Sequence, residues 1–93
     1  MSPAERLVAI ASRLREVLVP ANLEVVDESN LHVGHVGARD GRGHFFVRIQ
    51  ADCFVGLPPL ARHRAIYAAL GDLMTSDIHA LRISAMAPDE TQD

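Results

Sequence analysis

The sequence predicts a small α+β domain with the element order αββααβ, in which helices cover one three-stranded mixed sheet. Two segments with helical apolar spacing and three strand-like segments support this class, and the strand-like segments alternate or are rich in β-branched residues. A chain of 93 residues fits one domain, and its 48% apolar and 23% charged residues are typical of a globular protein. We predict a single domain over residues 1–88 and a disordered acidic tail over residues 89–93.

The first helix is predicted to begin at Pro3. Ser2 and Glu5 have the spacing of a capping box, and proline suits the first helical position. Pro20 ends the helix. Its apolar stripe consists of Leu7, Ile10, Ala11, Leu14, Val17 and Leu18.

Two strands are predicted on either side of a glycine-rich loop. Residues 23–27, LEVVD, form a short run of β-forming residues, and residues 44–51, HFFVRIQA, have the period of two of a half-buried strand. In the second run, the core-facing residues are Phe45, Val47 and Ile49, and they alternate with Phe46, Arg48 and Gln50. We expect the two runs to pair as a hairpin with a long loop.

A long helix and a last strand complete the sheet. Residues 59–77 have helical spacing through Ile66, Ala69, Leu70, Leu73 and Met74, and a separate helical turn before Arg62 is an alternative. Residues 78–86, IHALRISAM, form the last strand, with His79, Leu81, Ile83 and Ala85 on one face. Because a helix joins the second and third strands, these two strands can lie parallel.

The sequence lacks the patterns typical of membrane proteins, secreted proteins and several enzyme classes. No apolar run reaches the roughly 20 residues of a membrane helix, and no signal peptide is evident, so we expect a cytoplasmic protein. Cys53 is the single cysteine, which excludes an internal disulfide, and we interpret it as a small, partly buried apolar residue. Because the large catalytic motifs are absent, we expect no enzyme.

Histidines gather around the glycine-rich loop. His32, His35 and His44 lie within residues 30–45, and His79 begins the last strand of the same sheet. His79 is either a half-buried histidine with a packing role or a metal ligand that a loop histidine approaches. Two imidazoles are too few for a closed tetrahedral site, which takes four protein ligands. Either no metal binds, or a partner supplies the remaining ligands.

Arg62, His63 and Arg64 form a basic cluster in the first half of the predicted long helix. His63 lies between Arg62 and Arg64 and close to the apolar stripe, so it is either a packing histidine or part of a small anion-binding or nucleic-acid surface. The net charge of −3 argues against strong nonspecific phosphate binding.

The chain resembles the BolA-like family in five motifs: LEVVDES, HFFVRI, FVG, RHRAIYAAL and IHAL, which lie in this order within residues 22–86. The resemblance implies an αββααβ fold related to the KH class, and a non-enzymatic adaptor, monomeric alone, that shares a [2Fe-2S] cluster with a monothiol glutaredoxin in iron-sulfur trafficking or iron regulation. It implies His79 of the IHAL motif as one ligand and His32 as the second, with His44 in reserve. The partner's cysteine and glutathione would complete the coordination, an arrangement similar to the Rieske type.

The same resemblance implies a second function. BolA-like proteins are also described as stress-responsive transcription regulators that act on cell shape through a helix-turn-helix-like surface. Arg62, His63, Arg64 and Arg48 would then contact DNA or a partner. Phosphate contacts of this kind weaken steeply with salt, whereas cluster binding would depend on His79.

Overall fold

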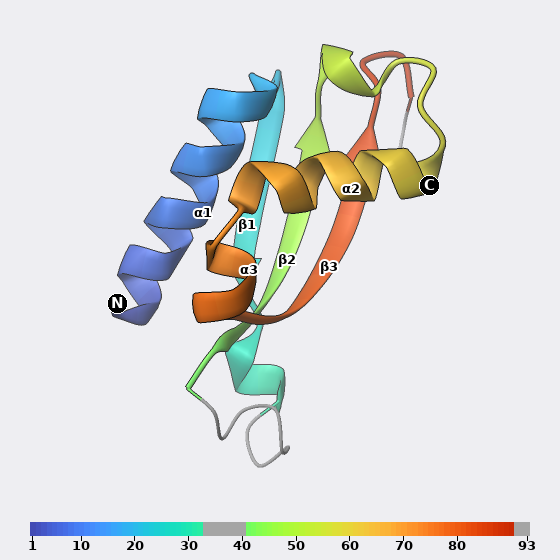
Figure 1. The fold of residues 1–93 in the computed structure, drawn as a ribbon. Helices are drawn as coiled ribbons and strands as arrows, with labels where there is room; N and C mark the ends of the chain where they lie inside the picture. The colour runs from blue at the N-terminus through green and yellow to red at the C-terminus, as the bar shows by residue number, and fades with distance from the viewer. Residues whose placement is uncertain (33–40, 91–93) are drawn as a thin grey trace.

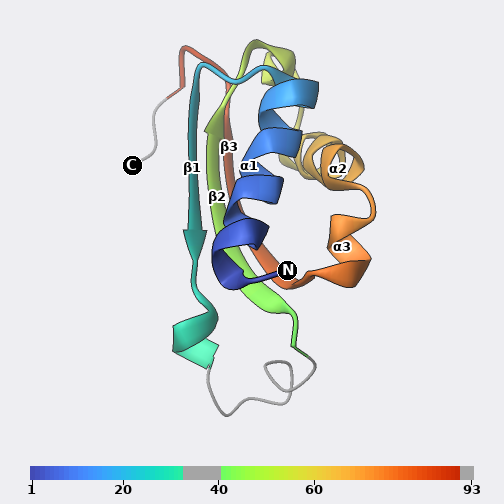
Figure 2. The same ribbon diagram turned by 90° about the vertical axis from the view of Figure 1, so that its left-hand side faces the viewer.

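The computed structural model describes residues 1–32 and 41–90, with Leu31 and His32 described by their backbone alone. The α-helices lie on one face of the sheet (Figures 1 and 2). The elements in chain order are α1 Pro3–Leu18, β1 Asn22–Asp27, the 3-10 helix η1 Ser29–His32, β2 Gly43–Gln50, the 3-10 helix η3 Asp52–Phe54, α2 Pro59–Leu70, α3 Leu73–Ser76 and β3 Ile78–Met86.

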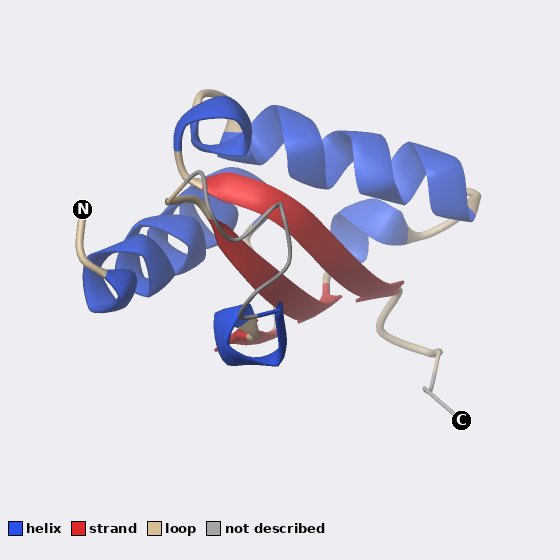
Figure 3. Ribbon diagram, turned by 90° about the horizontal axis from the view of Figure 1, so that it is seen from below, coloured by secondary structure: helices blue, strands red, loops and turns tan. Residues whose placement is uncertain are grey.

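The sheet has the order β1-β2-β3. β1 pairs antiparallel with β2, and β2 pairs parallel with β3. The predicted α+β class with a mixed sheet is therefore confirmed. Because β2 and β3 run in the same direction, the residues that begin these two strands lie at one end of the sheet, the end that faces the viewer in Figure 3.

Apolar residues from one face of the sheet and from the helices form the core. The capping box of α1 is present as predicted, because Glu5 N donates to Ser2 Oγ over 3.1 Å and Ser2 N donates to Glu5 Oε1 over 2.8 Å. Core side chains with no solvent exposure include Ile10, Leu14, Val47, Ile49, Phe54, Ile66 and Leu70. Each buried branched or aromatic side chain of this kind contributes about 1.5–3 kcal/mol through the hydrophobic effect.

The segment predicted as one long helix is divided at Gly71. Gly71 has a φ of 53°, and its N–H donates to Tyr67 O over 3.0 Å, which closes α2 before α3 begins. A positive φ is easy for glycine and costly for other residues. The helix therefore ends at Gly71, although the helical spacing of apolar residues continues past this position. Arg62 lies inside α2, and the separate helical turn that precedes α2 is η3.

The predicted face of β3 is wrong at its first position. Leu81, Ile83 and Ala85 pack against the core, but Ile78 is 1% exposed and His79 is exposed. The cause is a register shift: Gly43 pairs with Ile78 and the next residue of β2, His44, pairs with Ala80. His79 is the extra residue of this bulge, and such a residue interrupts the strand alternation.

Arg62 joins the start of α2 to the end of β3 in a set of contacts that we call the Arg62 clasp. Its Nε donates to Leu57 O over 2.8 Å, its Nη1 to Ala85 O over 3.1 Å, and its Nη2 to Glu90 Oε2 over 2.9 Å. Its side chain is 11% exposed. Glu90 was placed in the tail by its sequence pattern; here it forms an ion pair, and residues 91–93 lie outside the described residues.

Candidate functional site

Two histidines lie side by side where β2 and β3 begin, and we call this place the histidine end. The ring centroids of His44 and His79 are 5.2 Å apart, and the ring planes are inclined by 44°. His44 is 7% exposed, whereas His79 is exposed. The sequence predicted that a loop histidine would approach His79, and among the described side chains His44, the reserve residue, lies beside it.

Gly43 lies at this bulge, where the chain passes close to a buried ring. A Cβ on Gly43 would lie 2.6 Å and 2.7 Å from two ring carbons of Phe45, which is 1% exposed and cannot move aside. Gly43 N also donates to Asp77 O over 2.9 Å, which ties the start of β2 to the residue before β3. The absence of a side chain at position 43 thus lets the chain pass over Phe45 on its way to His44.

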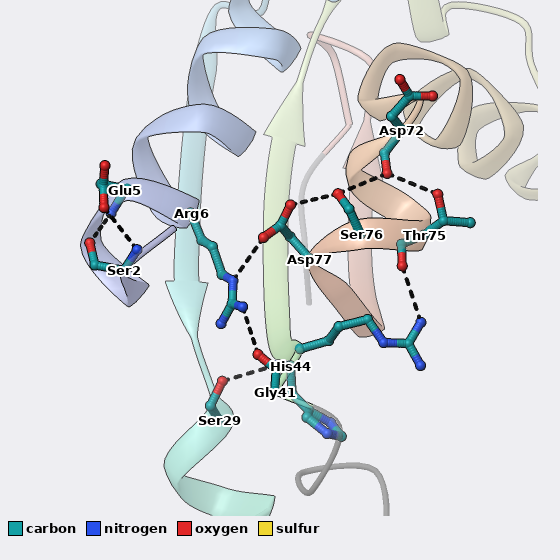
Figure 4. A network of polar contacts seen from close by, with 11 residues as sticks. Ser2, Glu5, Arg6, Ser29, Gly41, His44, Asp72, Thr75, Ser76 and Asp77 are labelled. Atoms are coloured by element: carbon teal, nitrogen blue, oxygen red, sulfur yellow. Dashed lines mark hydrogen bonds and ion pairs between the residues drawn. The ribbon is translucent and has the colours of Figure 1, made fainter.

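The backbone of His44 is fixed to η1. Its N–H donates to Ser29 Oγ over 3.1 Å, a contact drawn in Figure 4, and its carbonyl accepts from Glu28 N over 2.7 Å. η1 ends at His32, the predicted second ligand, and therefore runs beside the start of β2. The side chain of His32 and all of His35 lie outside the described residues.

Charged side chains surround the histidine end. Arg42 Nη2 lies 3.2 Å from His79 Nδ1, and Arg42 Nη1 donates to Thr75 O over 3.4 Å. Figure 4 shows Arg6 between Asp77 and Gly41: its Nε lies 3.1 Å from Asp77 Oδ1, and its Nη2 donates to Gly41 O over 2.6 Å. The Ser76 hydroxyl and the Arg6 guanidinium lower the pKa of Asp77. Asp77 is therefore a fixed anion at neutral pH.

The role of Arg42 was missed by sequence reasoning, although the sequence held a signal for it. Phe45 and Leu81 each begin a run of core-facing residues, and the structure pairs them. Pairing those two runs from the sequence alone would have placed residues 42–44 beside residues 78–80.

The face of the sheet opposite the helices carries an aromatic ring under two cations. The guanidinium carbon of Arg82 lies 4.1 Å from the Phe46 ring centroid, and that of Arg48 lies 5.5 Å away. Glu28 holds Arg82 at 2.6 Å and raises the pKa of that guanidinium, and Glu24 lies 3.2 Å from Arg48. These contacts explain why Phe46 is 8% exposed on a face that the alternation predicts to be polar.

The residues of the predicted basic surface lie in different surroundings. The guanidinium of Arg62 is bound in the clasp, and Arg48 lies on the sheet face opposite α2. Arg64 is exposed, and His63 is half-buried with its ring centroid 6.5 Å from that of Tyr67. Cys53, predicted to be partly buried, is exposed, with its Sγ 3.9 Å from Leu18 O.

Within residues 1–32 and 41–90, no group of three or more His, Cys, Asp or Glu side chains is arranged to hold a metal ion. No helix in the same part of the chain has the length and apolar character needed to cross a membrane.

Known proteins share this fold and much of this sequence. The family model described as BolA-like protein matches residues 14–90. The chain is 43% identical over 86 residues to SufE-like protein 1, chloroplastic/mitochondrial, of Arabidopsis thaliana, covering 87% of the chain and 23% of that protein. It is 36% identical over 83 residues to the DNA-binding transcriptional regulator BolA of Vibrio cholerae, covering 89% of the chain and 76% of the relative.

A solved structure has the same architecture over nearly its whole length. The BolA domain of SufE1 from Arabidopsis thaliana superposes with a TM-score of 0.84 at 41% sequence identity, covering 98% of this chain and 99% of that one. The alignment therefore includes both ends of the sheet.

Proposed function

Since this chain belongs to the BolA-like family, we propose that it is a non-enzymatic adaptor that binds a monothiol glutaredoxin and shares a [2Fe-2S] cluster with it. The observation that carries the proposal is the placement of His79, exposed at the histidine end with a second imidazole 5.2 Å away. An exposed imidazole can reach an iron that another protein holds. The adaptor would act in iron-sulfur trafficking or iron regulation, and its cytoplasmic location stays a prediction.

The donor set fits a shared group. Imidazole nitrogens replace two cysteines on one iron of Rieske clusters, so two histidines are an accepted half of a [2Fe-2S] coordination sphere. The glutaredoxin cysteine and glutathione would supply the sulfur donors on the other side. When bound, the cluster would supply electron-transfer and iron-transfer chemistry.

His79 and His32 would hold the iron, with His44 beside them. His44 is 7% exposed and sits under its neighbours, so an incoming iron meets His79 first. His32 lies on η1, which the Ser29–His44 hydrogen bond holds against the start of β2. We therefore keep His32 as the proposed second ligand and His44 as the reserve.

Visible absorption and circular dichroism after mixing with cluster-loaded monothiol glutaredoxin test this function. We expect wild type to change the spectrum, His79→Ala to abolish the change, and His32→Ala to weaken or abolish it. Val17→Ala, at an exposed position of α1, is the control and should behave as wild type. An unchanged spectrum for wild type, or a normal change for His79→Ala, would reject the proposal.

Transcription regulation is the second candidate function, favoured by the name of the Vibrio cholerae relative. Arg64, exposed on α2, is the residue of the basic cluster that remains available for phosphate contact. We expect Arg64→Ala to weaken DNA binding in a gel-shift titration and to reduce its salt dependence. Binding that is insensitive to salt would reject a phosphate-contacting role.

A further inference from the structure

The guanidinium of Arg42 contacts the ring of His79 at the histidine end. Its Nη2 lies 3.2 Å from His79 Nδ1. A guanidinium carries only donors and stays protonated in proteins, so Arg42 must be the donor in this contact. His79 Nδ1 is therefore the acceptor, and the proton of the neutral ring lies on Nε2.

A neutral imidazole has one nitrogen lone pair available to a donor or a metal. In this structure Arg42 uses it. We propose that Arg42 is a positioning residue that competes with iron for His79, holding the ring in the Nε2–H tautomer until a metal displaces the guanidinium. The inference rests on the proposed function and names a residue that controls its main ligand.

The competition does not depend on which ring nitrogen binds the metal. Coordination through Nδ1 places iron where the Arg42 N–H points. Coordination through Nε2 moves the ring proton to Nδ1. Nδ1 then no longer accepts a hydrogen bond, and its proton faces the Arg42 N–H. In both cases the contact between Arg42 and His79 has to break.

The surrounding contacts keep Arg42 in place while leaving its release possible. Its two neighbours in the chain are both fixed, since Gly41 O accepts from Arg6 and Gly43 N donates to Asp77 O. The guanidinium also contacts Thr75 O at the last turn of α3. It can therefore leave the ring and keep one anchor, which makes the contact a reversible one.

Nitrogen-15 NMR of the metal-free protein tests the tautomer. We expect long-range proton–nitrogen spectra of wild type at neutral pH to show His79 as a single Nε2–H tautomer. Arg42→Met keeps a long side chain without the donors and should give a mixture of the two tautomers. A proton on Nδ1 of His79 in wild type would overturn the inference, whether or not a cluster binds.

Zinc titration by calorimetry tests the competition without the partner. Loss of one hydrogen bond should raise the zinc affinity of Arg42→Met about two- to tenfold over wild type. The same change in a His79→Ala background should have no effect, which isolates the coupling between the two residues. Arg82→Met removes a cation from the same sheet and controls for long-range charge. An equal rise for Arg82→Met, or no rise for Arg42→Met, would overturn the inference.

Titration with cluster-loaded glutaredoxin separates the two proposals. If wild type changes the visible spectrum, Arg42→Met should reach half-saturation at a lower partner concentration. If Arg42→Met has the same half-saturation point as wild type, the role of Arg42 is overturned but the shared-cluster function is not. A wild type that never changes the spectrum overturns the shared-cluster function, and the competition with iron falls with it.

Discussion

Two arginines fasten opposite ends of β3 with contacts of different kinds. Arg62 binds two backbone carbonyls and the Glu90 carboxylate, and its side chain is 11% exposed. The described contacts of Arg42 include the Thr75 carbonyl and the ring of His79. Glu90 also pairs with Arg62 through both of its carboxylate oxygens, and such a two-point guanidinium–carboxylate pair adds strength and directionality that the contact between Arg42 and His79 lacks. We therefore expect β3 to be held more firmly at the clasp than at the histidine end.

Replacing each of the two arginines by methionine gives the largest expected effect and tests whether the two ends of β3 differ in stability. Arg62→Met leaves the carbonyls of Leu57 and Ala85 without their donor, and we expect the thermal midpoint to fall by about 5–10 °C. Arg42→Met should shift it by less than about 2 °C. Differential scanning calorimetry measures both. Equal shifts for the two variants would contradict this difference between the clasp and the histidine end.

Gly43→Ala sharpens the description of the histidine end. The added Cβ would crowd the buried Phe45 ring, and overpacking of this kind costs about 1–3 kcal/mol in the free energy of unfolding. Gly41→Ala is the matched control, because its Cβ would meet nothing within 4 Å and only its φ of 83° is strained. Urea unfolding compares them. A smaller loss for Gly43→Ala than for Gly41→Ala would show that crowding against Phe45 is unimportant.

Acid should loosen the clasp over a defined pH range. The Arg62 side chain and the Ala87 N–H hold the pKa of Glu90 at about 2, below its usual 4.5. Between these two pKa values, Glu90 binds more protons in the unfolded chain than in the folded one. The stability that Glu90 contributes is therefore full above pH 4.5 and is lost as the pH falls towards 2.

Glu90→Gln should flatten this pH dependence. Part of the slope should remain, because Asp77 and Glu5 also have lowered pKa values. Thermal unfolding between pH 2 and 6 measures the slopes. A variant with the slope of wild type would remove Glu90 from the acid response.

Local patterns predicted most of the elements. The capping box of α1 and the extents of β2 and β3 are set by residues close in sequence, so their positions could be inferred from spacing alone. The alternation expected for β2 is present only from Val47 onward, because Phe46 is covered by two arginines. The break at Gly71 was missed because the apolar stripe of α2 continues into α3. The side chain of Glu90 found its place through a partner 28 positions away, which no local pattern of an acidic tail indicates.

The candidate site was predicted in part. The resemblance selected His79 and a histidine of the β1–β2 loop, and the strand register brought His44 to His79. The bulge was not predictable from alternation, because it depends on how Gly43 and His44 pair with a strand far away in the sequence. Arg42 was overlooked because its contact with His79 depends on the same register, although the core-facing runs that begin at Phe45 and Leu81 carried a signal for that pairing.

The bulge at His79 separates the folding of the sheet from the use of the His79 side chain. Because His79 stands outside the alternation of β3 and is exposed, its side chain contributes little to the packing of the sheet. Variants at this position should remain folded and keep the thermal midpoint of wild type. If His79 serves the proposed function, a screen for solubility or thermal stability would therefore not detect its loss.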